Sequence, residues 1–248
     1  MFKKYIGFLL CITVFFGSCK TENKENNVFT KKFPEENKIV QYSYILRGID
    51  TVIQGKFIVY NKNKQKLAIG NYYNDKLSGK YTNYFSNGNI SQIKYYDKDI
   101  IVGDRIFNYA DGEVRKYVFH DYKSDPVFIV RFDKNGNVKS YEGKPLLDLK
   151  YLGKIDLDSL KTGDKLKYAF VLADVPTAKK TLNIQLLGYD NSKINRVIGA
   201  RNKSEIEVEE RIVKKGKNSV KAILKFTFND SLRTTITDSI KFDYFVNG

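Results

Sequence analysis

Residues 77–96 read Leu-Ser-Gly-Lys-Tyr-Thr-Asn-Tyr-Phe-Ser-Asn-Gly-Asn-Ile-Ser-Gln-Ile-Lys-Tyr-Tyr, and this stretch decides the fold class of the chain. Two runs rich in Tyr, Ile and Phe flank the dipeptide Asn87-Gly88, and such runs are typical of β-strands. Asn-Gly between them is a strong hairpin signal, because both central residues of the favoured two-residue turn need φ above zero. The stretch therefore predicts a β-hairpin.

The same pattern returns along the chain with a fixed step of 24 residues. A period between about 20 and 50 residues indicates an array of one supersecondary unit. Two strands and two turns fit in each unit, so we expect a continuous antiparallel meander, without helix, over residues 39–144. The positions that keep the step are Gly55, Gly79 and Gly103; Gly88, Gly112 and Gly136; Ile45, Ile69, Ile93, Tyr117 and Tyr141; and Ile90, Val114 and Val138.

These residues resemble the bacterial variant of the MORN repeat over about residues 51–143. One copy begins at Gly79 with Tyr81, Tyr84 and Asn87-Gly88, and the next begins at Gly103. The resemblance departs from the pattern at Lys64 and Val127, which stand where glycines are due. It implies a β-hairpin array with an interaction role and no catalytic residues. Proteins with such repeats are often labelled antitoxin components.

After Lys144-Pro145 the period is lost, and apolar residues alternate with polar ones. Alternation with period two indicates strands that bury one face. About seven short strands at this spacing predict an immunoglobulin-like β-sandwich over residues 145–248, so that the whole chain is all-β. The expected strands are 150–155, 165–173, 181–189, 196–199, 206–213, 220–228 and 236–244.

The N-terminus has the layout of an export signal: Lys3 and Lys4, an uncharged apolar run, then the small pair Gly17-Ser18 before Cys19. The apolar run is shorter than the roughly 20 residues that a membrane-spanning helix needs. Cys19 after the small pair resembles the lipobox of bacterial lipoproteins, although Phe16 replaces the commonest leucine. The resemblance implies that residues 1–18 are cleaved and that the Cys19 thiol receives a diacylglyceryl group. We thus expect a lipid-anchored protein of the cell envelope, with residues 19–38 as a polar tether.

The formal net charge is +15, yet the export signal argues against a nucleic-acid partner. The basic residues are mostly lysines spread singly along the chain, and only eight are arginines. Two explanations stay open: an AT-rich coding sequence, or attraction to anionic lipid heads or glycans. Cys11 leaves with the signal and Cys19 carries the lipid, so no thiol remains for a disulfide.

The sequence offers little for catalysis. His120 is the single histidine, and with Tyr72 and Tyr96 it keeps the 24-residue step, which indicates a recurrent aromatic position of the sheet. Without a second His or a free Cys, we expect no metal and no cofactor. A carboxylate pair for glycoside hydrolysis stays open, although turn chemistry explains most aspartates. These are Asp75, Asp97, Asp99, Asp111 and Asp133.

The tyrosines are the better functional lead. Tyr60 and Tyr84 recur at one repeat position, and Tyr72 and Tyr96 recur at another. Equivalent residues two strands apart lie on one face, about 10 Å from each other. Such rows stack on sugar rings or a partner protein, or they form a ladder that stabilises the sheet.

The sequence therefore predicts a non-enzymatic binding or scaffolding module of the cell envelope that acts on a protein or glycan partner. Two alternatives stay open. The repeat resemblance allows a protective partner of the antitoxin or immunity type, and the many carboxylates allow a surface hydrolase.

Overall fold

The computed structural model describes residues 27–153 and 156–247. It is all-β with antiparallel sheets, as the sequence predicts, and one 3-10 turn at Asn191–Lys193 is the single helical element in these ranges. No helix within them is long and apolar enough to cross a membrane. The predicted signal peptide and the lipidation site Cys19 lie outside the described residues.

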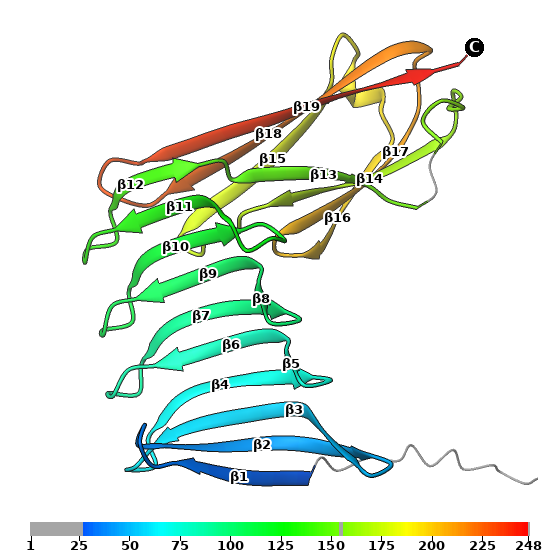
Figure 1. The fold of residues 1–248 in the computed structure, drawn as a ribbon. Helices are drawn as coiled ribbons and strands as arrows, with labels where there is room; N and C mark the ends of the chain where they lie inside the picture. The colour runs from blue at the N-terminus through cyan, green and yellow to red at the C-terminus, as the bar shows by residue number, and fades with distance from the viewer. Residues whose placement is uncertain (1–26, 154–155, 248) are drawn as a thin grey trace, which may run out of the picture.

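Residues 27–143 form one twelve-stranded sheet in which neighbours in sequence pair with one another. The strands are stacked like rungs in Figure 1, from β1 in blue to β12 in green. The short strands β5 and β8 pair only with β4 and β7. The strands are β1 Asn27–Phe33, β2 Lys38–Arg47, β3 Asp50–Asn61, β4 Lys66–Tyr73, β5 Lys76–Leu77, β6 Gly79–Tyr84, β7 Ile90–Asp97, β8 Ile100–Ile101, β9 Gly103–Asn108, β10 Val114–His120, β11 Pro126–Phe132 and β12 Val138–Gly143.

The Asn-Gly turn differs from the expected type. Gly88 has a φ of 88°, whereas Asn87 has no positive φ. The turn closes with Phe85 N–H donating to Asn89 O at 2.8 Å and Gly88 N–H donating to Phe85 O at 3.0 Å. This is a three-residue loop with a bulge, in which only the glycine needs the left-handed conformation. The pairs with two positive φ values are Asn74-Asp75 and Lys98-Asp99, at the opposite edge of the repeats.

Residues 27–33, expected as part of the tether, form strand β1. Polar composition hid this strand, in which Phe29 is the residue that packs on aromatic rings of β2. The Phe29 ring lies 5.0 Å from the Tyr42 ring and 5.6 Å from the Tyr44 ring, measured between centroids. These ring contacts stabilise the pairing of β1 with β2, although β1 is otherwise mostly polar.

Residues 146–247 form two smaller sheets that face each other across a common core, at the top of Figure 1. The four-stranded sheet has the order β13-β14-β17-β16, and the three-stranded sheet has the order β15-β18-β19. The strands are β13 Leu146–Tyr151, β14 Lys165–Leu172, β15 Ala178–Leu186, β16 Arg196–Asn202, β17 Glu205–Arg211, β18 Gly216–Phe228 and β19 Thr235–Val246.

A buried ion pair ties the two smaller sheets together. Arg196 Nε donates to Glu210 Oε2 at 2.7 Å, and Arg196 Nη1 donates to the Ile184 carbonyl at 2.7 Å. Glu210 is 2% exposed, so removal of either partner leaves an uncompensated buried charge. Arg196 on β16 thereby connects β17 of one sheet with β15 of the other.

The core of the two smaller sheets continues into the end of the large sheet. Phe128 on β11 is fully buried, and its ring stacks on Phe226 of β18 with centroids 6.4 Å apart. Phe132 meets Phe228 at a tilt of 53°, with ring centroids 6.0 Å apart. The hairpin of β10 and β11 therefore belongs to the large sheet and also contributes side chains to the core of the two smaller sheets.

Phe128→Ala should lower the free energy of unfolding by about 3–5 kcal/mol, because it removes a fully buried ring and leaves a cavity. Urea unfolding followed by tyrosine fluorescence measures the change. Tyr141→Ala on the neighbouring strand is the control, since Tyr141 is 51% exposed. Equal effects of the two substitutions would contradict a common core at β11.

Candidate functional site

A ladder of aromatic rings crosses one face of the large sheet from β1 to β7. Tyr72 and Tyr96, two of the predicted positions, belong to it. Phe57 lies 5.0 Å from Tyr72 and 5.6 Å from Tyr81, and Tyr81 lies 5.7 Å from Tyr96, between ring centroids. Tilted and edge-on contacts at such distances stabilise aromatic pairs beyond their buried area. We call this set the aromatic ladder: Phe29, Tyr42, Phe57, Tyr72, Tyr81 and Tyr96.

Gly70 on β4 makes room for the ladder. A Cβ at this position would lie 2.6 Å from Phe57 Cε1 and 3.1 Å from Tyr81 Cδ2. The absence of a side chain therefore lets the Phe57 ring, which is 5% exposed, lie flat across the strand. The ladder depends on a glycine that is outside every turn.

Gly70→Ala should destabilise the protein by about 1–3 kcal/mol, the usual cost of overpacking. Gly199→Ala is a matched control: Gly199 also lies in a strand, and a Cβ there meets nothing within 4 Å. Chemical denaturation of both variants measures the difference. A Gly70→Ala protein as stable as the control would mean that the ladder rings rearrange freely.

Tyr72, Tyr96 and His120 occupy equivalent places in the strand pairing. They lie opposite Gly55, Gly79 and Gly103 respectively. These glycines have φ values of 95°, 75° and 66°, which L-residues with a Cβ rarely adopt. Of the three side chains, the two tyrosines join the ladder, whereas His120 lines a pocket at the far end of the sheet.

Tyr60 and Tyr84 are placed differently from the ladder. Tyr60 is the last residue of β3 that pairs with β4. It follows a bulge and lies opposite Lys66. Tyr84 follows a bulge in the pairing of β6 with β7, and the Lys66 ammonium lies 5.4 Å from its ring centroid. Among the described residues neither ring contacts another aromatic ring. Tyr84 instead lines a groove, described next.

Cations continue the ladder face onto β7, β9 and β10. The Lys94 ammonium lies 4.6 Å from the Tyr81 centroid and 5.1 Å from the Tyr96 centroid. On the next strands, Arg105 and Lys116 lie 4.6 and 4.8 Å from the Phe107 ring. Such contacts hold a cation by the negative face of the ring.

A groove of about 800 Å³ runs over these strands. It shares Lys38, Leu67 and Asn83 with a second hollow of about 290 Å³ that reaches toward β1. Polar amides and cations therefore line the groove together with aromatic rings. The lining of the groove includes Lys38, Asn83, Gln92, Lys94, Phe107 and Arg115.

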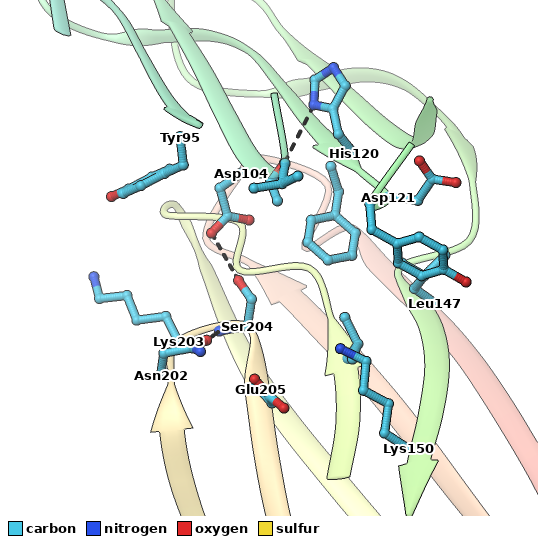
Figure 2. A pocket seen from close by; sticks show the side chains of 15 residues that line it. Tyr95, Asp104, His120, Asp121, Leu147, Lys150, Asn202, Lys203, Ser204 and Glu205 are labelled. Atoms are coloured by element: carbon cyan, nitrogen blue, oxygen red, sulfur yellow. Dashed lines mark hydrogen bonds between the residues drawn. The ribbon is translucent and has the colours of Figure 1, made fainter. Parts of the chain in front are cut away.

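A separate pocket of about 430 Å³ lies where the large sheet meets the four-stranded sheet (Figure 2). His120 and Tyr95 come from the large sheet, and Lys150, Lys203 and Glu205 come from the other side. The His120 Nδ1 lies 3.4 Å from the Gly103 carbonyl oxygen. This pocket is lined by residues far apart in sequence, so of its lining only His120 could be singled out from the sequence.

A polar network beside the pocket joins the two parts of the chain. Asp104 on β9 accepts hydrogen bonds from the Tyr117 hydroxyl and, at 2.9 Å, from Ser204 Oγ. The Asp174 N–H donates to Tyr117 Oη at 2.8 Å, and Lys180 Nζ lies 2.7 Å from Asp174 Oδ1. Burial raises the pKa of Asp104, against the opposing effect of the bonds that it accepts. Sequence reasoning missed this network, because its members show no shared spacing.

Burial also lowers the pKa of His120 below its ordinary value of 6.5. A lowered pKa means that the folded protein binds this proton less tightly than the unfolded chain. Protonation therefore costs stability as the pH falls through 6.5 toward the folded pKa. At neutral pH the imidazole is uncharged.

An NMR titration of His120 should give a midpoint below 6.5. The chain holds a single histidine, so one imidazole signal reports the site. Asp121→Asn is a useful second sample, because the Asp121 carboxylate raises this pKa and its removal should move the midpoint further down. A midpoint above 6.5 in the wild type would show that a carboxylate outweighs burial.

Four of the turn aspartates accept hydrogen bonds from backbone N–H groups. Asp75 Oδ1 accepts from the Ile53 N–H, and Asp99 Oδ1 accepts from the Leu77 N–H, each at 2.7 Å. Asp111 and Asp133 accept from backbone N–H groups two residues on. Within residues 27–153 and 156–247, no three His, Cys, Asp or Glu side chains are grouped closely enough to hold a metal ion.

Comparison with known proteins gives no family for this chain. No family model matches it, and no curated protein matches it. A solved structure entitled "Crystal structure of the S-layer protein SbsC domains 4 and 5" aligns with 88% of this chain and 99% of its own. The sequence identity is 10% and the TM-score is 0.26, which is too low to support an argument about fold or function.

Proposed function

We propose that this protein is a non-enzymatic lipoprotein of the cell envelope that binds a macromolecular partner with one face of its large sheet. The observation that carries the proposal is the groove of about 800 Å³ with its aromatic and cationic lining. A single-layer sheet leaves both faces uncovered over most of its length, and one of them here gathers aromatic rings. Aromatic residues commonly dominate binding energies at interfaces.

Within this proposal, the large sheet is an array of MORN-like hairpins and the C-terminal part is an immunoglobulin-like sandwich. Supporting the array, the residues at 72, 96 and 120 each lie opposite a glycine of positive φ. Supporting the sandwich, four strands face three across one core. Both architectures host many functions, so the functional part of the proposal depends on the groove.

The anchor is tested by Cys19→Ser. Stable membrane attachment takes about two acyl chains, which a diacylglyceryl group on Cys19 supplies. The variant should move from the detergent phase to the aqueous phase, or remain unprocessed, in a Triton X-114 partition. Cys11→Ser removes the other thiol of the chain and should leave partitioning unchanged. Detergent partitioning of both variants like the wild type would overturn the lipoprotein assignment.

Binding itself is tested by capture from solubilised envelope with the immobilised full chain. A binding module should retain a protein or a glycan through repeated washes. A hydrolase would instead release a product and retain nothing.

A further inference from the structure

Four cations gather on one face of neighbouring strands, and we call them the basic face: Lys94 on β7, Arg105 on β9, Lys116 on β10 and Arg131 on β11. Lys116 and Arg131 are direct partners in the strand pairing. Like charges directly opposite each other destabilise a sheet. The pairing of β10 with β11 therefore brings the like charges of Lys116 and Arg131 together at a cost in stability.

The cations of the basic face have little neutralising charge around them. Arg131 pairs with Glu142 at 2.8 Å. Lys94, Arg105 and Lys116 take part in none of the ion pairs formed in residues 27–153 and 156–247. Burial lowers the pKa of Lys116, and Arg131, Arg105 and Arg115 lower it further. An anion over this face would relieve that repulsion.

Aromatic rings and amides hold these cations in defined positions. The Phe107 ring lies between Arg105 and Lys116, at 4.6 and 4.8 Å from the two cationic groups. When the Gln92 amide is oriented with its oxygen toward Arg105, that oxygen accepts from Arg105 Nε at 2.8 Å and from Nη2 at 2.9 Å. The Gln92 amide and the Phe107 ring thereby hold the Arg105 guanidinium against the face of the sheet.

The shape of the groove fits an extended chain. Its lining runs from Lys38 on β2 to Arg115 on β10, across six strand-to-strand steps. At about 4.8 Å per step this is roughly 29 Å. Its rings are suited to the apolar faces of sugars, its amides to hydroxyl groups and its cations to carboxylate or sulfate. A lipid bilayer is flat, whereas the groove is concave and has the half-buried Lys94 among its lining residues.

We propose that the basic face and its groove bind an acidic polysaccharide, a chain of sugars that carry carboxylate or sulfate groups. This inference rests on the proposed binding function and specifies the class of partner. Lys94, Arg105 and Lys116 contact the acidic groups, and the Tyr81 and Phe107 rings hold these cations in place.

The test measures binding of the purified full chain to polysaccharides by affinity electrophoresis and calorimetry. The probes are polygalacturonate for carboxylate, dextran sulfate for sulfate and uncharged dextran as the neutral control. We expect binding to at least one acidic polymer and none to uncharged dextran. Equal binding to the neutral polymer, or binding only to phosphatidylglycerol vesicles or to single-stranded DNA, would overturn the proposal.

A matched pair of variants locates the site. The triple substitution Lys94→Gln, Arg105→Gln and Lys116→Gln should lower affinity by at least about tenfold. Lys179→Gln, Arg233→Gln and Lys225→Gln remove the same charge from exposed positions of the C-terminal part and should change affinity by no more than about twofold. Equal losses would mean attraction by net charge alone and would overturn the site.

Lys116→Met keeps the binding test possible if the triple variant does not fold. The methionine chain can still cover Phe107, while the charge is lost and the repulsion from Arg131 disappears. We expect higher thermal stability together with weaker binding of the acidic polymer, an outcome that a structural role alone would not produce. Unchanged affinity would overturn the proposal. If acidic polymers fail to bind but envelope capture still retains a partner, the acidic-polysaccharide inference falls and the binding function stands.

Discussion

The structure depends on the packing of the β10–β11 hairpin against β18. A single sheet buries no interior of its own, and within the described residues no other element packs against the faces of most of the large sheet. At β11 this changes, because Phe128 and Phe132 meet Phe226 and Phe228 and enter a common core. That contact orients the β10–β11 hairpin. Each hairpin before it in sequence is positioned by strand pairing with the next hairpin.

Away from this contact, aromatic rings on one face replace a core. Phe57 is buried although the part of the chain that the structure describes places no second layer over this region, because the rings of Tyr42, Tyr72 and Tyr81 surround it. Cross-strand pairs of this kind contribute roughly 0.2–1 kcal/mol each, so many of them are needed. The same rings also position cations, and one set of residues thereby serves both stability and the proposed binding.

The sequence revealed the features that repeat and concealed those that occur once. Turn residues and alternating apolar residues predicted the all-β class, and the 24-residue step singled out Gly55, Gly79 and Gly103, which lie opposite Tyr72, Tyr96 and His120. The type of the turn at Asn87-Gly88 was not predictable from the dipeptide, since the loop length depends on how the flanking strands pair. The network of Asp104, Tyr117 and Ser204 links residues up to 100 positions apart, and no local pattern marks such contacts. The basic face was equally hidden, because its four cations are far apart in sequence and meet only across strands.

The position of β1 in the large sheet has a mechanical consequence. Within the described residues, β1 pairs with β2 alone, from Asn27 to Phe33. Tension applied at that end would load one pair of hydrogen bonds at a time, and β1 would peel away before β2 felt the full force. Successive hairpins would then extend one after another while the two-layered part at the other end stayed folded. The sheet would thus lengthen in steps under load and limit the force that reaches the rest of the molecule.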